Sequence, residues 1–213
     1  MSARRRRALS CRGYTLLEMT IALVVFATVL MAIGLTSRKT TDAMEEKTSA
    51  EIMSRRAHST IDRIIDPLVE LELGALPTLE DGGDTLVYHV PLGWDAGIQW
   101  DDYERLALEY DPGELDDGID NDGDELVDEC QLVLTKDYLG AEEKRLVICR
   151  NVSEFLEGET PNGLDDNDND LDDERGFSVD VQGDVLTLRL TLERMGEQGL
   201  VQTTATSSVR VRN

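Results

Sequence analysis

The feature that most constrains this chain is an apolar segment, residues 14–34, in which Glu18 is the one charged residue. As an α-helix its 21 residues would rise about 30 Å, the thickness of the hydrocarbon core of a bilayer. Residues 1–13 carry five arginines and no acidic residue, so we expect them on the cytoplasmic side and the rest outside. A carboxylate in a membrane helix is costly and usually faces a partner or an aqueous path. Glu18 is therefore a candidate functional residue.

Ordinary targeting signals offer three interpretations of this segment. A secretory signal would be cut after its apolar part, and the small residues of 32–34 form an acceptable cleavage site. A lipoprotein signal would use Cys11, but no apolar segment precedes that cysteine. A twin-arginine signal is compatible with the arginine run, although Cys11 and Arg12 separate that run poorly from the apolar stretch. None of the three explains Glu18.

The residues around Gly13 favour a fourth interpretation. They are, in order, Arg4–Arg7, Gly13, Tyr14, Thr15, Leu16, Leu17 and Glu18. This pattern closely resembles the N-terminus of type IV prepilins and type II secretion pseudopilins, with Tyr14 where phenylalanine is more usual. The resemblance implies that prepilin peptidase cleaves between Gly13 and Tyr14 and that Tyr14 is then N-methylated. The apolar helix would be retained, because cleavage occurs before it.

Within this family, Glu18 has a physical explanation. Cleavage would leave a positive α-amino group on Tyr14, and a buried charge is tolerable only when it is paired. Glu18 lies one helical turn along, so the resemblance implies an assembly contact with its own or a neighbour's amine. The alternative is that Glu18 extends to the membrane surface. Its presence argues against the tip pseudopilin, which lacks this residue, and the C-terminal VRVRN is similar to the J-type minor branch.

The chain beyond a leader (1–13) and an assembly helix (14–34) divides into two further parts. Residues 35–72 predict an amphipathic helical stem with an end or kink near Pro67. Its apolar residues recur at three- and four-residue steps and should pack on a sheet: Met44, Ile52, Met53, Ala57, Ile61, Ile64, Ile65 and Leu68. Residues 73–213 predict a β-rich globular domain.

Alternating apolar and polar residues predict the strands of this domain. The segments are 85–90, 105–110, 131–135, 145–149, 177–181, 185–193 and 208–212. Turn residues at 182–184 and 196–199 give short connections, which favour antiparallel pairing. The expected fold class is α+β and pilin-like, a long N-terminal helix packed on an antiparallel sheet.

Two of the three cysteines would remain after cleavage, because Cys11 lies in the leader. Cys130 and Cys149 flank a predicted hairpin with its loop near residues 139–140, and regular pairing places them opposite each other. A disulfide at the hairpin base is expected in an oxidising compartment, where it would stabilise the fold by about 3 kcal/mol. Two buried free thiols are the alternative.

An internal repeat is the strongest chemical signal. Residues 118–129 and 163–174, within acidic loops 111–129 and 157–174, align without a gap at an offset of 45. Oxygen-bearing side chains recur two residues apart and again at the ninth position, so they are candidate calcium ligands. They are Asp120, Asp122, Asp124 and Asp128 in the first loop, and Asp165, Asn167, Asn169 and Asp173 in the second. The peptide oxygens of Leu126 and Leu171 could add one ligand each.

These loops resemble the Asp-x-Asp-x-Asp calcium loops of EF-hand, dockerin and thrombospondin-type repeats. The turn glycine at position six is replaced by Glu125 or Asp170, and position twelve holds Gln131 or Gly176 instead of glutamate. We therefore expect weak calcium binding, with Kd about 10⁻⁴–10⁻³ M. Solvated acidic loops that bind no specific ion are the alternative, although residues 111–129 hold ten acids and no base. Zinc is disfavoured, because the two histidines are far apart in sequence.

The charge balance and the missing catalytic motifs limit the function. Residues 14–213 hold 16 basic and 44 acidic side chains, so the chain should repel nucleic acid. No nucleophile–base pair or phosphate loop is recognisable, so an enzyme is not expected. The resemblance implies a minor pilin or pseudopilin in the bacterial inner membrane with a periplasmic head. Its partners would be other pilin or pseudopilin subunits and prepilin peptidase. The alternative is a membrane-anchored, calcium-dependent adhesive or ligand-binding protein.

Overall fold

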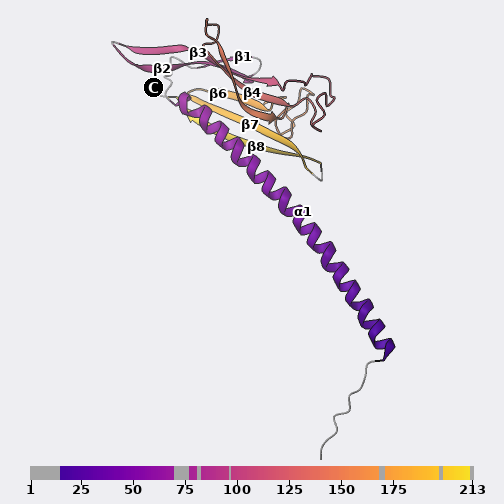
Figure 1. Ribbon diagram of the computed structural model, residues 1–213. Coiled ribbons are helices and arrows are strands. Elements are labelled where there is room, and N and C mark those ends of the chain that lie inside the picture. Colours follow the sequence, from indigo (N-terminus) through magenta and orange to yellow (C-terminus); the bar gives the residue numbers. More distant parts are fainter. Residues whose placement is uncertain are drawn as a thin grey trace, which may run out of the picture. The chain divides into compact units, whose positions relative to one another are not determined.

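The computed structural model describes residues 15–69, 77–80, 83–95, 97–167, 171–196 and 199–211. In these residues one long helix precedes a series of β-strands, which is the α+β, pilin-like layout that the sequence predicts (Figure 1). The elements are α1 (Leu16–Leu68), β1 (Thr78–Glu80), β2 (Thr85–Trp94), β3 (Ile98–Tyr110), β4 (Cys130–Lys136), β5 (Lys144–Val152), β6 (Phe177–Gln182), β7 (Val185–Gly196) and β8 (Gly199–Arg210).

The chain divides into two compact units, and the first ends at Glu45. In this unit α1 contains a segment, Leu16–Arg38, that is long and apolar enough to cross a membrane, with a mean hydropathy of 2.4. Its large apolar side chains are exposed, as expected of a helix whose surroundings are lipid or other apolar helices. Thr20 and Thr28 donate their hydroxyl protons to carbonyl oxygens one turn back, so these polar groups are satisfied within the helix.

The second unit begins at Glu46 and includes the rest of α1. Here one face of the helix is buried, as the spacing predicts: Met53, Ala57, Ile61, Ile64 and Leu68. The predicted face was too broad, because Ile52 is 61% exposed and lies outside this line of positions. Met44, in the first unit, is also exposed. The helix ends at Leu68, one residue after Pro67, close to the end that the proline predicted.

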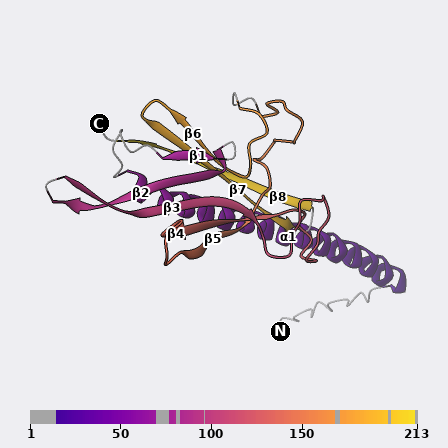
Figure 2. The same ribbon diagram turned by 90° about the horizontal axis from the view of Figure 1, so that it is seen from above.

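The described strands form one antiparallel sheet in the order β1-β2-β3-β4-β5-β7-β6, with β8 also paired to β7 (Figures 1 and 2). β5 meets β7 at the single pair Val152 and Leu192. The buried face of α1 joins the apolar side chains of the sheet in one core, in which Phe177 and Leu188 are fully buried. This burial is the main source of stability for the second unit.

The predicted strands are found, but several are longer than predicted. β3 begins at Ile98 instead of 105, because its first part forms a hairpin extension with β2 that includes Asp101 and Asp102. β8 begins at Gly199 instead of 208 and pairs with β7 along its whole length. Its residues 202–208 are mostly polar, so alternation did not reveal them. The turn between β6 and β7 lies at residues 183–184, as predicted.

The predicted disulfide is wrong in this structure. Cys130 and Cys149 are both free thiols, and both are buried. The prediction placed them opposite each other, but the hairpin pairs Lys136 with Lys144, which is already one residue out of that register, and two register shifts follow between β4 and β5. As a result, Cys149 pairs with Leu132 and Cys130 pairs with Val152. The register at the turn and the two bulges together keep the thiols out of the directly opposite positions that the predicted disulfide needs.

Candidate functional sites

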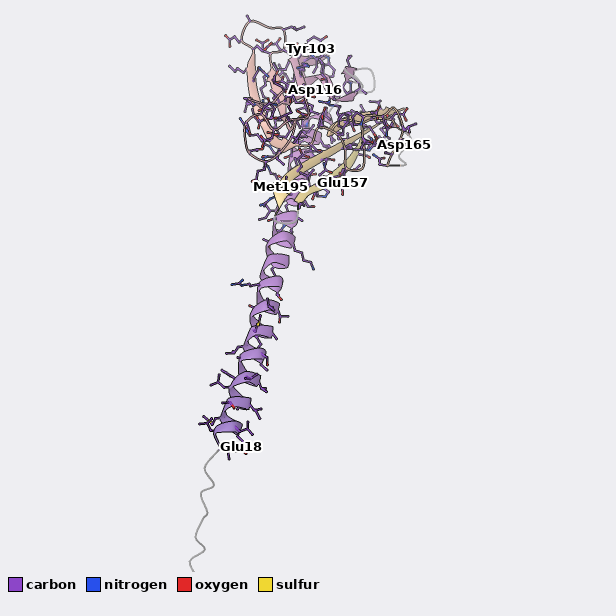
Figure 3. All side chains as sticks on the ribbon, turned by 90° about the vertical axis from the view of Figure 1, so that its right-hand side faces the viewer. Glu18, Tyr103, Asp116, Glu157, Asp165 and Met195 are labelled. Carbon is purple, nitrogen blue, oxygen red and sulfur yellow. The ribbon has the colours of Figure 1, made fainter. Side chains whose placement is uncertain are left out.

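The first candidate site is the N-terminal turn of α1. Gly13 and Tyr14 lie outside the described residues, whereas Glu18 lies in the first turn (Figure 3). Its Oε2 accepts hydrogen bonds from the backbone N–H of Thr15 at 2.9 Å and from the Thr15 hydroxyl at 3.0 Å. The N–H of Glu18 donates in return to Thr15 Oγ1 at 3.3 Å. This is a capping box, an arrangement that the sequence signals through threonine and glutamate three residues apart.

The capping box determines where the Glu18 carboxylate points. It faces back along the chain to the helix N-terminus, where the helix dipole favours a negative group. The next residue before Thr15 is Tyr14, whose amino group prepilin cleavage would free. The local structure of α1 therefore aims the carboxylate toward the end of the helix at which a new positive charge would form.

The second candidate site comprises the two acidic loops, marked by Asp116 and Asp165 in Figure 3. The first loop connects β3 to β4 and the second connects β5 to β6. Equivalent antiparallel pairs close their bases: Tyr110 with Cys130, and Phe155 with Arg175. The 45-residue repeat therefore extends beyond the 12-residue match that the sequence showed, to the residues that close each loop.

The loop backbones repeat in detail. The N–H of Asp111 donates to the carbonyl of Glu129 at 3.0 Å, and the N–H of Leu156 donates to that of Glu174 at 2.9 Å. Gly118 and Gly163 occupy the left-handed region with φ of 73° and 74°, which favours glycine at this turn. The described parts of the two loops therefore share one backbone arrangement.

Asp128 and Asp173, which the spacing predicts as ligands, occupy equivalent places in the two loops and accept hydrogen bonds from the loop backbone. Asp128 Oδ2 accepts a hydrogen bond from the N–H of Gly118 at 2.8 Å. Asp173 Oδ2 accepts the same bond from Gly163 at 2.7 Å. Both carboxylates also accept from the residue before the glycine. In the structure these two side chains brace the loop backbone.

Each loop also contains one buried glutamate that was not predicted as a site residue. Its carboxylate accepts hydrogen bonds from the backbone of the same loop. Glu114 Oε1 accepts from the N–H of Asp122 at 2.9 Å, and Glu159 Oε1 accepts from the N–H of Asn167 at 3.0 Å. Both glutamates are at most 8% exposed. Burial raises the pKa of Glu159. The signal was available, because Glu114 and Glu159 are also related by the 45-residue offset, just before the aligned segments.

Among the described residues, two groups of carboxylates lie close enough to hold one cation. One comprises Glu114, Asp120 and Asp122, and the other comprises Asp122, Asp124 and Glu129. Within each group, ligand atoms lie within 4.8 Å of one another, a spacing that Ca–O bonds of about 2.3–2.6 Å can span. The predicted residues Asp120, Asp122 and Asp124 are thus brought together, and Asp128 is in neither group.

Glu129 is the most deeply buried member, with 1% of its surface exposed. Burial raises the pKa of its carboxyl to about 7, and the negative charges of Asp124, Glu114 and Asp122 add to this rise. Both aligned loop segments end in Asp-Glu. The spacing of calcium-loop ligands selects the aspartate of this pair, so Glu129 was not predicted as a ligand.

The second loop is less completely described. Asn169 and its two neighbours lie outside the described residues, and Asp165 is in the described part of the loop. Asn167 replaces Asp122 at the position common to both carboxylate groups. A neutral amide there lowers the negative charge available to a cation, so the second loop is the weaker candidate.

Arg175 joins the bases of the two loops. Its guanidinium donates to Glu154 at 2.8 Å and to the Tyr110 hydroxyl at 3.2 Å. Its Cζ lies 5.4 Å from the ring centroid of Tyr110 and 5.3 Å from that of Phe155, so the cation lies over both rings. Because Tyr110 and Phe155 are equivalent in the repeat, one arginine holds both copies together.

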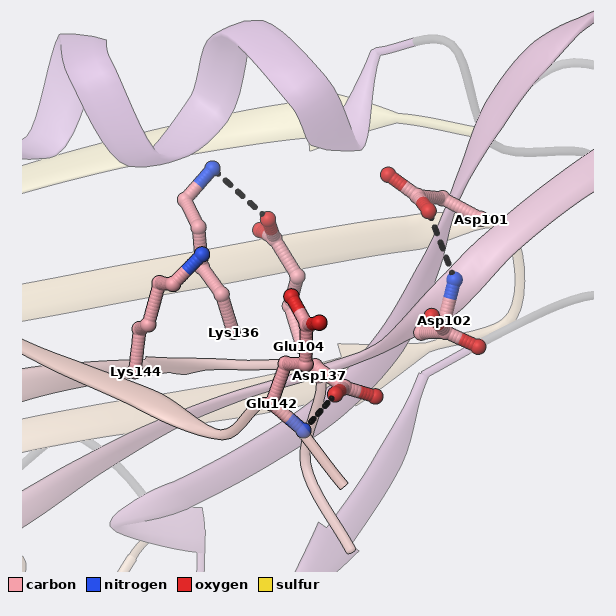
Figure 4. A pocket seen from close by; sticks show the side chains of 7 residues that line it. All are labelled: Asp101, Asp102, Glu104, Lys136, Asp137, Glu142 and Lys144. Atoms are coloured by element: carbon pink, nitrogen blue, oxygen red, sulfur yellow. Dashed lines mark hydrogen bonds and ion pairs between the residues drawn. The ribbon is translucent and has the colours of Figure 1, made fainter. Parts of the chain in front are cut away.

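A separate polar pocket lies beside β3 and the β4–β5 turn (Figure 4). Its central contact is the ion pair between Glu104 and Lys136 at 3.0 Å, and Glu104 also accepts from the Tyr88 hydroxyl at 3.0 Å. Asp137 accepts from the N–H of Glu142 at 2.6 Å and so fixes the turn. These contacts give Glu104, Lys136 and Asp137 structural roles.

Comparison with known proteins bears on the first candidate site. A family model described as the prokaryotic N-terminal methylation motif matches residues 9–34, the region of Gly13, Tyr14 and Glu18. No curated protein and no solved structure matches the chain. The matched motif implies N-terminal processing and assembly with other pilin-type subunits, and its proteins are structural. Together with the apolar helix and the antiparallel domain, it supports a type IV pilin-like precursor that is anchored by α1.

Proposed function

We propose that this chain is a minor pilin or pseudopilin, a structural subunit of a type II secretion pseudopilus or a type IV pilus. The observation that carries the proposal is the methylation motif at residues 9–34, which overlaps the membrane-length segment Leu16–Arg38. The pilin-like layout of helix and antiparallel sheet supports it independently.

In this proposal the precursor inserts with its arginine-rich leader in the cytoplasm and its β-rich head in the periplasm. Prepilin peptidase removes residues 1–13, and Tyr14 becomes the N-methylated first residue. The apolar part of α1 then passes from the membrane into the filament, where it packs against the equivalent helices of other subunits. The exposed apolar side chains of Leu16–Arg38 are suited to both surroundings.

Glu18 guides the packing step. Its carboxylate already faces the helix N-terminus through Thr15, so pairing with an α-amino group requires little rearrangement. Inside an apolar filament, an unpaired amine or carboxylate would carry a large desolvation penalty. The pair therefore favours the helix register in which the two charges meet.

The proposal also assigns calcium a stabilising role in the head. The first acidic loop supports it, because its carboxylates converge and residues 111–129 contain no basic side chain. A divalent cation would relieve the mutual repulsion of these groups.

The assembly role is tested with Glu18→Ala, using Glu51→Ala as the control. Glu51 lies on the same helix and is exposed in an ion pair with Arg55. Membrane fractionation should show equal insertion of both variants. Recovery in sheared filaments should fall at least about 100-fold for Glu18→Ala, because breaking a buried pair costs about 3–5 kcal/mol. Normal recovery of Glu18→Ala would refute the proposed role of the pair.

A further inference from the structure

Glu129 is a buried carboxylate whose environment lacks a counter-charge. It is 1% exposed, and neither of its carboxylate oxygens accepts a hydrogen bond from another described residue. An ionised carboxylate in such a place costs several kcal/mol unless a cation or donors satisfy it. A buried carboxylate without a hydrogen-bond partner requires a physical explanation, and a bound ion is one.

The nearest charged groups are also negative, so they add repulsion to the cost of burying the Glu129 carboxylate. Ligand oxygens of Asp122 and Asp124 lie within 4.8 Å of that of Glu129, so three carboxylates converge. Basic side chains near the loop base have other partners: Arg150 pairs with Asp111 at 2.7 Å, and Arg175 pairs with Glu154 at 2.8 Å. The described protein groups therefore leave the convergent charge uncompensated.

The backbone around this cluster is held in place by other acids. Asp128 braces Gly118, and Glu114 accepts from the N–H groups of Asn121 and Asp122. Asp122 and Asp124 each bond a backbone N–H through Oδ1, which fixes the direction of their carboxylates. The cluster is thus preorganised, so a cation would find its ligands already close together.

We propose that the first acidic loop binds Ca²⁺ with Glu129 as the anchoring ligand, together with Asp122 and Asp124. Glu114 and Asp120 extend the site on the other side of Asp122, the residue that both carboxylate groups share. This inference rests on the calcium part of the proposed function and changes its ligand set, because Asp128 becomes a brace and Glu129 takes its place.

The chemistry of the site favours calcium over other common cations. All five side chains offer carboxylate oxygens, which suit hard cations rather than zinc or copper. Asp120, Asp122 and Asp124 lie on an exposed loop, and Ca²⁺ accepts six to eight oxygens in irregular geometry. Mg²⁺ requires a near-ideal octahedron at about 2.0–2.1 Å and is expected to bind less well.

The test compares thermal unfolding of the full chain in detergent micelles, in EDTA and in excess Ca²⁺, for wild type, Glu129→Gln and Glu125→Gln. Glu125 is exposed on the same loop and lies in neither carboxylate group. Glu125→Gln therefore removes one negative charge from the loop but leaves all the proposed ligands in place. At about 100 times Kd, Ca²⁺ should raise the Tm of wild type and Glu125→Gln by roughly 5–10 °C. Glu129→Gln should show no such rise.

The Tm in EDTA distinguishes a ligand from a structural residue. Because Glu129→Gln removes an uncompensated charge, its Tm in EDTA should equal or exceed that of wild type. Asp124→Asn, a change at an exposed position, should also abolish the calcium response. A calcium response in Glu129→Gln that equals that of wild type would overturn the Glu129 site alone. A wild type without any response would overturn calcium stabilisation as well, while the filament role would still depend on Glu18→Ala.

Discussion

The carboxylate of Asp128 accepts a hydrogen bond from the backbone N–H of Gly118 at 2.8 Å, across ten residues of acidic loop. Asp173 and Gly163 repeat this contact at 2.7 Å. Asp128 is the residue that the spacing of calcium-loop ligands selects, and this contact directs its side chain toward the loop backbone. It gives the described parts of two loops of different sequence the same backbone contact, and Glu129, unlike Asp128, lies in one of the two carboxylate groups that could hold a cation.

The brace predicts a stability effect that is independent of calcium. Asp128→Ala removes charge-assisted hydrogen bonds to Asp117 and Gly118, so the free energy of unfolding should fall by about 1–3 kcal/mol. Urea titration in EDTA measures this loss. Asp116→Ala, an exposed position in the same loop, should change the free energy by less than about 0.5 kcal/mol. If Asp128→Ala had wild-type stability in EDTA and lost only its calcium response, Asp128 would be a ligand.

Gly176 predicts a severe steric effect. A Cβ at this position would lie 1.6 Å from the carbonyl oxygen of Ser153, a backbone atom that pairing fixes. Gly176→Ala should therefore destabilise the domain by about 3 kcal/mol or more. Gly196→Ala is the control, because its Cβ would lie 3.2 Å from the Val201 side chain and 3.3 Å from the Gly199 carbonyl oxygen, contacts that shifts of a few tenths of an ångström relieve. Equal melting temperatures for the two variants would contradict the packing described at the base of the second loop.

The two thiols predict slow chemical labelling. Cys130 and Cys149 are at most 1% exposed, and burial raises the pKa of Cys130 to about 12, so little thiolate forms near pH 8. Folded protein should react with a maleimide only as fast as it opens. Without reductant, unfolding in urea should make both thiols available, as counted by mass spectrometry. A chain that is 2 Da lighter and takes up no label at these cysteines would show the disulfide instead.

Arg175 predicts coupling between the two loops. Arg175→Met keeps much of the apolar contact with Tyr110 and Phe155 but leaves Glu154 without its ion pair. We expect a loss of about 1–3 kcal/mol in the free energy of unfolding. Hydrogen exchange should become faster at the bases of both loops. Arg145→Met, which removes a more exposed pair with Glu109, should leave that exchange unchanged; faster exchange in one loop only would contradict the coupling.

The sequence predicts those features that depend on local pattern. The membrane-length helix, the buried line of the stem and most strands follow from hydropathy and periodicity. The start of β8 does not, because polar residues such as Thr203 and Ser207 pair with β7 without an alternating pattern. Long strand pairing is decided by the neighbouring strand and not by local composition.

In the candidate sites, too, local pattern identifies some residues, whereas others depend on the folded structure. Glu18 is identified by its unusual place in an apolar segment. The partner of Cys149 depends on the register at the turn and on a shift between Leu132 and Val133 that the sequence does not signal, so counting along the hairpin gives the wrong partner. Glu129 could not be separated from Asp128 by spacing alone, because the choice depends on which side chain the loop backbone holds.

The most direct test of the filament proposal is the intact mass and N-terminal residue of the protein purified from its native membrane. The account predicts a chain that begins at Tyr14, with the mass of one added methyl group. A chain that keeps residues 1–13, or one that begins after Gly34, would contradict it. The first would be an ordinary anchored protein, and the second would have lost the helix on which assembly depends.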